Sequence, residues 1–294
     1  MKMEKGANAK CRALTGLNQD EWITLLPVFS KLVEQRLRWY TLKGKKRKRP
    51  CYKEYENSSL PGSDRKLNFA LMYSKENPNQ TFYAQMFGLS QAKVSEWFSF
   101  LLPLLETSLN RLGMAPMTGG RFEYRDQGEE YLLADVTECE VPRKVNNAAQ
   151  KEEYSGKSKR HTAKYLVFSA PNRKILYVSP LYPGSVHDKT IWDETEIQVD
   201  GPNILVDLGF LGADKENENV IIPHKKPKGK ELTELQKQVN KGISSVRVGA
   251  EHAIGGIKRL KIIRNKIRLK YNDVRERVMM VAVGLHNLRC EFRT

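Results

Sequence analysis

Apolar residues recur at helical spacing through the first hundred positions, which predicts helices there. Four segments fit this spacing: Asn18–Arg36, Asp64–Glu76, Thr81–Phe87 and Gln91–Leu102. Asn18, with Glu21 three residues later, has the pattern of a capping box at the start of the first segment. Gly88 and Ser90 separate the last two segments, and helix, glycine-containing turn and helix is the layout of a helix-turn-helix near residues 80–105.

The pattern changes at Tyr131, where short apolar runs replace the helical spacing. Five of these runs predict strands: Tyr131–Glu138, Thr162–Ser169, Ile175–Ser179, Ile204–Asp207 and Asn219–Pro223. A turn at Pro171 and Asn172 joins the second strand to the third. A helix that begins at about His187 separates the third strand from the fourth.

Two long helices are predicted after the last strand. The first opens with a capping box at Thr233–Gln236, and its apolar stripe continues to Ile257, with Gly242 as a place where it could break. The second covers Asp273–Cys290. Strands followed by a helix, further strands and helices predict an α/β (α+β) fold in which a mixed sheet carries helices on its faces.

The same patterns predict a division of the chain into domains. Residues 1–110 form an all-α domain that contains the helix-turn-helix, and residues 131–294 contain the sheet. Residues 111–130 have a mixed composition and are interpreted as a connector.

The charge balance narrows the class of partner. Lysine and arginine outnumber aspartate and glutamate by 50 to 34, so the net charge is +16. This favours a polyanion such as nucleic acid, because neutralised phosphates release counterions. Two basic runs without acids, residues 43–50 and 258–270, lead us to expect backbone contacts from Lys45, Lys46, Arg47, Lys258, Arg259, Lys266 and Arg268. The alternative is a solvated basic surface.

The second helix of the helix-turn-helix leaves polar residues outward near its N-terminal end. These are Gln91, Lys93 and Ser95, which occupy the positions where recognition helices meet base edges. They are predicted to contact DNA. The alternative interpretation is an ordinary helical hairpin with a polar outer face.

Other broad classes are disfavoured. No run of 18 or more apolar residues occurs, so no membrane span is expected, and the N-terminus lacks the apolar core of a signal peptide. The four cysteines are Cys11, Cys51, Cys139 and Cys290, which form no C-x-x-C pair and fit a reducing compartment. We therefore expect a cytoplasmic protein, associated with the nucleoid if the cell is prokaryotic.

Three carboxylates suggest the chemistry. Asp135 and Asp207 each end an apolar run, and Glu251 lies on a later predicted helix. Two Mg²⁺ ions about 3.5–4 Å apart can activate a nucleophile and relieve charge on a leaving oxygen, and few carboxylates suffice to hold them. Asp135 would bridge both ions, Asp207 would hold one and Glu251 the other. Each residue taken alone is more often a turn or surface residue.

The helix around Glu251 carries basic residues on the same predicted side. Arg247 lies four positions before Glu251, and Gly255 and Lys258 follow at helical spacing. Arg247 and Lys258 could meet phosphates there, and Gly255 would allow close approach of DNA. A solvated face with an Arg–Glu pair is the alternative.

Five ordered motifs resemble those of a known family. They are Asp135-Val-Thr, Tyr182-Pro-Gly-Ser-Val-His187-Asp188, Val206-Asp207-Leu-Gly-Phe, Ile222-Pro-His-Lys-Lys and Arg247-Val-Gly-Ala-Glu251-His-Ala-Ile-Gly-Gly-Ile-Lys258. They look like the DDE-superfamily transposases of the insertion-sequence-five and Harbinger-like branch. The resemblance covers about Leu14 to Arg289 and implies an RNase H-like catalytic domain.

The resemblance also implies an activity. Asp135, Asp207 and Glu251 would form the catalytic triad and bind Mg²⁺ or Mn²⁺. Members bind the terminal inverted repeats of a mobile element, cleave there and join the 3′ ends to target DNA in an oligomeric synapse. A homo-oligomer on double-stranded DNA is therefore expected. A domesticated DNA-binding regulator and a metal-dependent nuclease without strand joining remain alternatives.

The second acid of the triad is ambiguous. His187-Asp188 is itself a family motif, so Asp188 could take that role. We prefer Asp207 because the second acid of this fold follows the fourth strand, which residues 204–206 provide. Asp188 would begin a helix, where a carboxylate is favoured by the positive end of the dipole. A secondary role for His187 and Asp188 beside the metals stays open.

Overall fold

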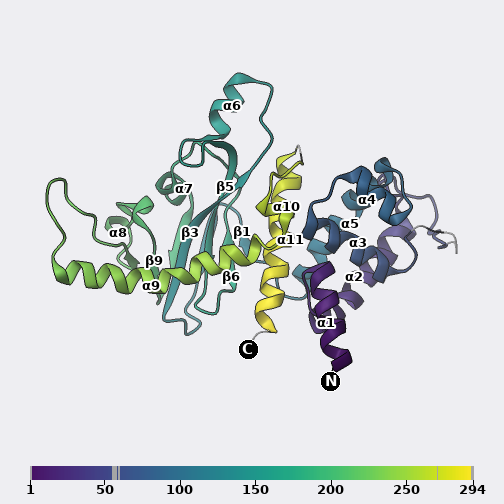
Figure 1. Ribbon diagram of the computed structural model, residues 1–294, viewed down its shortest axis with the longest axis horizontal. Helices are drawn as coiled ribbons and strands as arrows, with labels where there is room; N and C mark the ends of the chain where they lie inside the picture. Colours follow the sequence, from purple (N-terminus) through teal and green to yellow (C-terminus); the bar gives the residue numbers. More distant parts are fainter. Residues whose placement is uncertain (1, 55–57, 59, 270, 293–294) are drawn as a thin grey trace. The chain divides into compact units, whose positions relative to one another are not determined.

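The structure is a computed structural model that describes residues 2–54, 58, 60–269 and 271–292 (Figure 1). The chain forms two compact units. The first unit comprises Met1–Ala115, Ile257–Asn265 and Asp273–Thr294, and the second comprises Pro116–Gly256 and Lys266–Asn272. The C-terminal helix therefore belongs to the first unit, whereas the predicted division assigned residues 131–294 to one domain.

The first unit is built from helices. They are α1 (Lys2–Thr15), α2 (Gln19–Trp39), α3 (Gly62–Glu76), α4 (Gln80–Phe87), α5 (Gln91–Arg111), α10 (Lys261–Arg264) and α11 (Asn272–Glu291). The capping box that the sequence predicted is present at α2, where the Glu21 amide donates to Asn18 Oδ1 at 2.8 Å and the Asn18 amide donates to Glu21 Oε2 at 2.7 Å. Helix α1 was not predicted, because its sequence contains few large apolar residues.

Helices α4 and α5 have the predicted helix, turn, helix arrangement. Gly88 ends α4 in the left-handed conformation, with φ of 63°, which glycine adopts without strain. The Ser90 hydroxyl caps α5 by accepting from the Lys93 amide at 3.3 Å. Helix α5 continues past Leu102 to Arg111, although Pro103 lies inside it. Buried leucines beyond the proline, such as Leu105, explain why tertiary packing outweighs its helix-breaking tendency.

The second unit contains a mixed sheet. Its strands are β1 (Met117–Thr118), β3 (Tyr131–Glu140), β4 (Tyr154–Ser155), β5 (Arg160–Ser169), β6 (Ile175–Val178), β7 (Tyr182–Pro183), β9 (Asn203–Leu205) and β10 (Val220–Ile221). The main order is β1-β6-β5-β3-β9-β10. Strand β3 pairs antiparallel with β5 and parallel with β9. This mixed sheet with flanking helices confirms the predicted fold class and is consistent with an RNase H-like domain.

The segment interpreted as a connector contains regular structure. Strand β2 (Arg121–Tyr124) pairs in parallel with β8 (Glu196–Val199) to form a separate two-stranded sheet. Phe122 at the centre of β2 is fully buried. Because the partner strand lies some seventy positions later, this pairing leaves no signal in the local sequence pattern.

Alternation along β3 places successive side chains on opposite faces of the sheet. Leu132 and Ala134 face the core that includes Ile191 of α7 (Asp188–Glu194). Leu133 faces the other way and packs against Ala250 of α9 (Glu234–Ile257), which crosses that face in Figure 1. Asp135 follows the same alternation as Leu133 and therefore lies on the α9 face.

Shorter helices complete the second unit. They are α6 (Asn147–Glu153), the 3₁₀ helix η1 (Leu208–Phe210) and α8 (Ala213–Glu216). Helix α9 passes through Gly242 without a break. It ends at Ile257, so Lys258 lies in the following turn and not on the helical face that it was predicted to share with Glu251. Lys270 lies outside the described residues.

No helix among the residues that the structure describes is long and apolar enough to cross a membrane. The cysteines Cys11, Cys51, Cys139 and Cys290 are all free thiols.

Candidate active site

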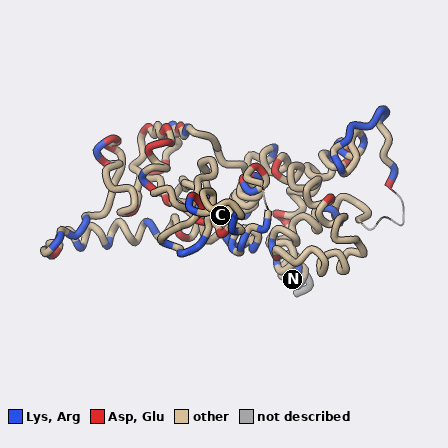
Figure 2. The backbone as a smooth tube through the Cα atoms, turned by 90° about the horizontal axis from the view of Figure 1, so that it is seen from above, with Lys and Arg blue, Asp and Glu red and all other residues tan. Residues whose placement is uncertain are grey.

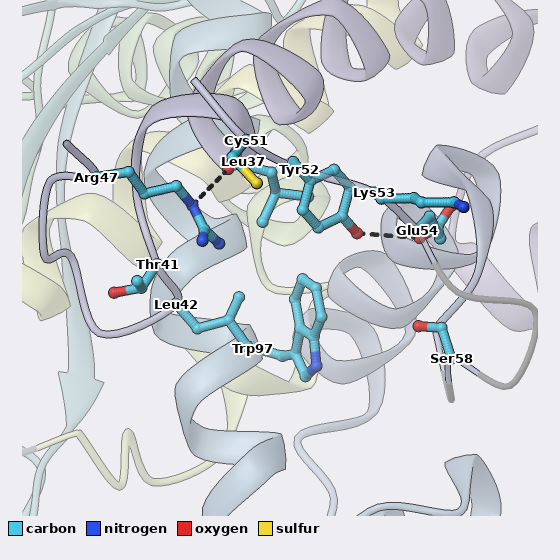
Figure 3. Close-up of a pocket in the computed structure, with 10 residues that line it drawn as sticks. All are labelled: Leu37, Thr41, Leu42, Arg47, Cys51, Tyr52, Lys53, Glu54, Ser58 and Trp97. Atoms are coloured by element: carbon cyan, nitrogen blue, oxygen red, sulfur yellow. Dashed lines mark hydrogen bonds between the residues drawn. The ribbon is translucent and has the colours of Figure 1, made fainter. Parts of the chain in front are cut away.

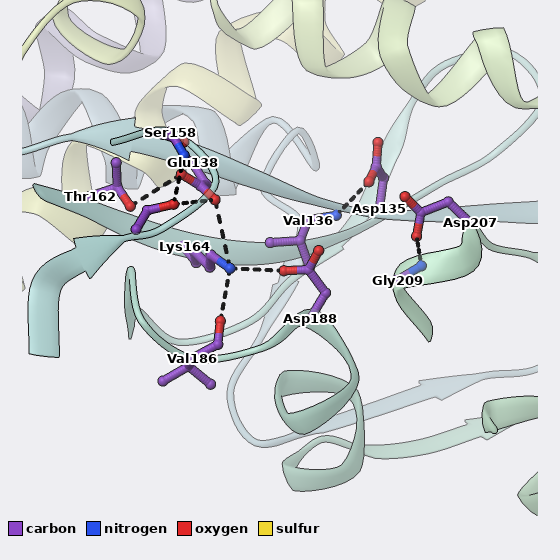
Figure 4. A network of polar contacts seen from close by, with 11 residues as sticks. Asp135, Val136, Glu138, Ser158, Thr162, Lys164, Val186, Asp188, Asp207 and Gly209 are labelled. Atoms are coloured by element: carbon purple, nitrogen blue, oxygen red, sulfur yellow. Dashed lines mark hydrogen bonds and ion pairs between the residues drawn. The ribbon is translucent and has the colours of Figure 1, made fainter. Parts of the chain in front are cut away.

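Asp135 and Asp207 lie beside each other because their strands are paired in register. Leu133 of β3 is the partner of Leu205 of β9, and each aspartate follows two residues later along parallel strands. Asp207 lies just beyond β9 and caps η1, where its Oδ1 accepts from the Gly209 amide at 2.8 Å. Figure 4 shows the two carboxylates at the same end of the strand pair.

The environment of Asp135 disfavours its negative charge. The pKa of Asp135 is raised to about 6, chiefly because of burial; the positive charge of Arg247 lowers this pKa and the charge of Asp207 raises it. The Val136 amide donates to Asp135 Oδ1 at 2.8 Å and Asp188 adds a smaller repulsion. Asp135 is therefore repelled by two neighbouring carboxylates in a half-buried place, and a nearby cation would favour its charged form.

The side chains of this site carry the type of oxygen atom that binds divalent metal ions. Carboxylate oxygens are hard ligands of the kind that Mg²⁺ and Mn²⁺ prefer. Within the described ranges, however, no group of three or more His, Cys, Asp or Glu side chains converges closely enough to hold a metal ion. The aspartates therefore provide the beginning of such a site rather than a completed ligand set.

Glu251, the predicted third metal ligand, lies apart from the two aspartates. It is exposed on α9, one helical turn after Arg247, and is not brought together with the aspartates. Arg247 instead acts electrostatically on Asp135. In the described part of the chain, the buried Arg247 Nε has no hydrogen-bond partner. The role of Glu251 as third ligand stays a prediction.

Asp188, the alternative second acid, has a different hydrogen-bond partner from Asp207. It begins α7 after the capping position His187. Its Oδ1 accepts from Lys164 Nζ on β5 at 3.0 Å, and the same ammonium donates to the Val186 carbonyl at 2.8 Å (Figure 4). Asp188 is thus tied to a buried lysine, whereas Asp207 is tied to a backbone amide.

Glu138 completes the network around Lys164. Its Oε1 lies 3.6 Å from Lys164 Nζ, across the β3–β5 pair. Burial by itself would raise the pKa of Glu138, but hydrogen bonds from Ser158 and Ser155, together with the charge of Lys164, hold that pKa below its usual range. This network was not predicted from the sequence, although a lysine inside an apolar strand was a signal for it.

The predicted base-reading residues lie on the exposed side of α5. Lys93 Nζ forms an ion pair with Glu96 at 2.7 Å, and Gln91 Nε2 donates to Gln80 of α4. Ser95 is exposed. These side chains are accessible, and the pair with Glu96 is a weak exposed one that a phosphate or base could replace.

The basic run after α2 is a continuous blue stretch in Figure 2. Lys45 and Lys46 are exposed in it, as a backbone contact requires. Arg47 is half-buried, and its Nε donates to the Leu37 carbonyl at 3.2 Å. Arg47 therefore anchors the loop to α2 and leaves the terminal guanidinium nitrogens for other contacts.

Arg47 also lines a pocket of about 420 Å³ in the first unit (Figure 3). Trp97 forms another part of its wall. Tyr52 lines the same pocket (Figure 3), and its hydroxyl donates to Glu54 Oε1 at 3.2 Å. This pocket was not predicted, because the segment around Tyr52 has no helical or strand pattern.

The basic residues of the C-terminal half differ in their surroundings. Lys266 Nζ forms an ion pair with Glu140 Oε1 at 2.9 Å, and the neighbouring Ile267 amide donates to the Glu140 carbonyl. Arg268 and Arg259 are exposed, whereas Lys258 is half-buried. Lys266 thus fastens its segment to β3 as well as contributing positive charge.

Comparison with known proteins agrees with the resemblance in the sequence. Residues 134–287 match the family described as DDE superfamily endonuclease. The chain is 29% identical over 161 residues to a probable transposase for insertion sequence element IS702 from Microchaete diplosiphon, covering 54% of this chain and 57% of that protein. It is 26% identical over 233 residues to a putative transposase for insertion sequence element IS112 from Streptomyces albus G, covering 78% of this chain and 81% of that protein. No solved structure matches the chain significantly.

The matched range takes in more than half of the 294 residues and contains the three predicted acids. The chain therefore belongs to the DDE superfamily of endonucleases, and proteins named as transposases are among its relatives. It spans little more than half of the IS702 protein and about four fifths of the IS112 protein. The narrower insertion-sequence-five and Harbinger-like branch stays a prediction.

Proposed function

We propose that this protein is a DNA transposase that cleaves the ends of a mobile element and transfers the 3′ ends to target DNA. The observation that carries the proposal is the pair Asp135 and Asp207, placed side by side by parallel strands in a chain of the DDE superfamily. Both relatives bear transposase names, which supports strand transfer over simple cleavage.

Asp135, Asp207 and Glu251 are the residues that would hold Mg²⁺ or Mn²⁺. Two such ions, when bound, would lower the pKa of the attacking water or 3′-hydroxyl and offset charge on the leaving oxygen. Asp135 supplies its carboxylate from the central strand, where β3 and β9 fix its direction. The Gly209 amide holds one oxygen of Asp207, which limits the rotation of that carboxylate.

Arg247 and Glu251 belong to the same helix, which packs on β3 and β9 through Ala250. This packing carries Arg247 to the aspartates and leaves Glu251 one turn further along. We propose that Arg247 meets a phosphate of the DNA and that Glu251 provides the third carboxylate. The buried, unpartnered Arg247 Nε in the described structure supports a phosphate ligand, since an anion would satisfy it.

DNA recognition is proposed to reside in the first unit. Helix α5 presents Gln91, Lys93 and Ser95, and the exposed Lys45 and Lys46 would contact the backbone. The net charge of +16 supports binding of a polyanion. Cleavage at two element ends implies a synaptic homo-oligomer.

The test is cleavage of a linear DNA that carries the element ends with their flanking sequence, in Mg²⁺. The wild-type protein should nick at the ends, and Asp207→Asn should lower the rate at least about a thousandfold while end binding persists. Asp193→Asn is the matched control, because Asp193 lies exposed on α7 and pairs with Lys189. Full cleavage by Asp207→Asn would contradict the assignment. Binding without cleavage by the wild type would favour a domesticated regulator.

A further inference from the structure

Lys164 is a buried cation in the sheet beside the proposed metal site. Its side chain on β5 is only 8% exposed. An ammonium has three protons to donate, and here they are directed to the Val186 carbonyl, to Asp188 at 3.0 Å and toward Glu138 at 3.6 Å. A buried lysine does not readily leave such partners, because its charge would then be buried without a counter-charge or water.

The two carboxylates that share Lys164 differ in how many other hydrogen-bond donors they have. Glu138 also accepts hydrogen bonds from Ser155 and Thr162, each at 3.2 Å, and from Ser158. It therefore has donors of its own if Lys164 is removed. Asp188 depends on Lys164 for the contact that directs its Oδ1 away from Asp135 (Figure 4).

Asp188 lies close enough to the proposed site to compete with Asp207. A Cβ atom built on Gly209 would lie 2.8 Å from Asp207 Oδ1 and 3.3 Å from Asp188 Oδ2, so both carboxylates border the same turn. The charge of Asp188 also acts on Asp135. Two aspartates are thus near Asp135, and one of them is held by a lysine.

We propose that Lys164 is a positioning residue that selects the second acid of the site: it retains Asp188 in a buried ion pair and so leaves Asp207 to bind metal with Asp135. The inference rests on the proposed function and deepens it. It explains how two neighbouring aspartates can have different roles without any difference in residue type.

The experiment measures Mn²⁺ binding to the full-length protein without DNA, by electron paramagnetic resonance of the free ion. Asp207→Asn should weaken binding about tenfold or more, since even groups outside the ligand shell are worth about 10- to 100-fold in affinity. Adding Lys164→Met should release Asp188 and recover at least about tenfold of the loss. Lys164→Arg keeps the charge and should recover nothing, and Asp188→Asn added to the Lys164→Met/Asp207→Asn protein should abolish the recovery.

Glu138→Gln in the Asp207→Asn protein is the matched control. It removes the other acidic partner of Lys164 but keeps the pair with Asp188, so binding should stay weak. Circular dichroism checks folding, and if Lys164→Met unfolds the protein, the same change with Glu138→Gln restores the charge balance and takes its place. A folded Lys164→Met/Asp207→Asn protein that binds Mn²⁺ no better than Asp207→Asn overturns the proposal. A wild-type protein that binds no Mn²⁺ contradicts the proposed function itself, and the role of Lys164 with it.

Discussion

Replacing Asp135 by asparagine should stabilise the metal-free protein while it destroys activity. Burial, partly offset by Arg247 and reinforced by Asp207, raises the pKa of Asp135 from an ordinary 3.8 to about 6. The folded state therefore holds the Asp135 proton more tightly than the unfolded chain does. The contribution of Asp135 to the free energy of unfolding falls as the pH rises from about 4 to about 6 and stays level above that. The full destabilisation by the ionised carboxylate is therefore present at neutral pH.

The size of the effect follows from the pKa difference. A difference of about two corresponds to about 3 kcal/mol, because one pH unit is worth about 1.4 kcal/mol. Asp135 is partly exposed, and solvent screening reduces this to about 1–2 kcal/mol. Asparagine has nearly the same shape and can still accept from the Val136 amide, so the substitution removes the charge with little change in packing.

Thermal melting in EDTA at pH 7.5 measures this directly. Asp135→Asn should melt about 2–6 °C above the wild type, and the gap should close near pH 4. In Mg²⁺ the wild type should gain stability that the variant does not. Asp214→Asn, at an exposed position of α8, should shift the midpoint little. An equal or lower midpoint for Asp135→Asn in EDTA would show that the surroundings of Asp135 do not disfavour its negative charge as described.

Three further predictions concern separate parts of the protein. Gly209→Ala should lower cleavage at least about tenfold with end binding retained in a gel-shift assay, because its Cβ would displace Asp207; unchanged cleavage would refute the close approach. Lys266→Glu and Arg268→Glu should each flatten the dependence of DNA affinity on salt, and an unchanged slope would refute the backbone contact. Gln91→Ala should reduce the preference for element ends over random DNA in competition binding, and unaltered discrimination would mean that α5 is not the reader.

The local pattern was sufficient for the elements that carry the two aspartates. The apolar runs before Asp135 and Asp207 predicted β3 and β9, and the choice of Asp207 followed from their order along the chain. Spacing on a helix could not say which turn of α9 faces the sheet. Ala250 decides this by packing on β3 and β9, and it brings Arg247 rather than Glu251 toward Asp135.

What the sequence could not supply depends on contacts between distant positions. The β2–β8 pair joins Phe122 to Ile197, and neither strand is recognisable alone. The Lys164 network needs Glu138 opposite it in register and Asp188 from a later helix. The run of α5 through Pro103 reflects burial of the leucines that follow, which overrides the local preference of proline.

The most direct test of strand transfer is a joining reaction that begins after cleavage. Element-end DNA with a free 3′-hydroxyl is incubated with a target plasmid and Mg²⁺, and joined products are resolved on a gel. The wild-type protein should join the 3′ end to the plasmid, and Asp135→Asn should yield no joined product while it still binds the end. Cleavage of uncut ends without any joining by the wild type would contradict the proposal of a transposase and identify a nuclease.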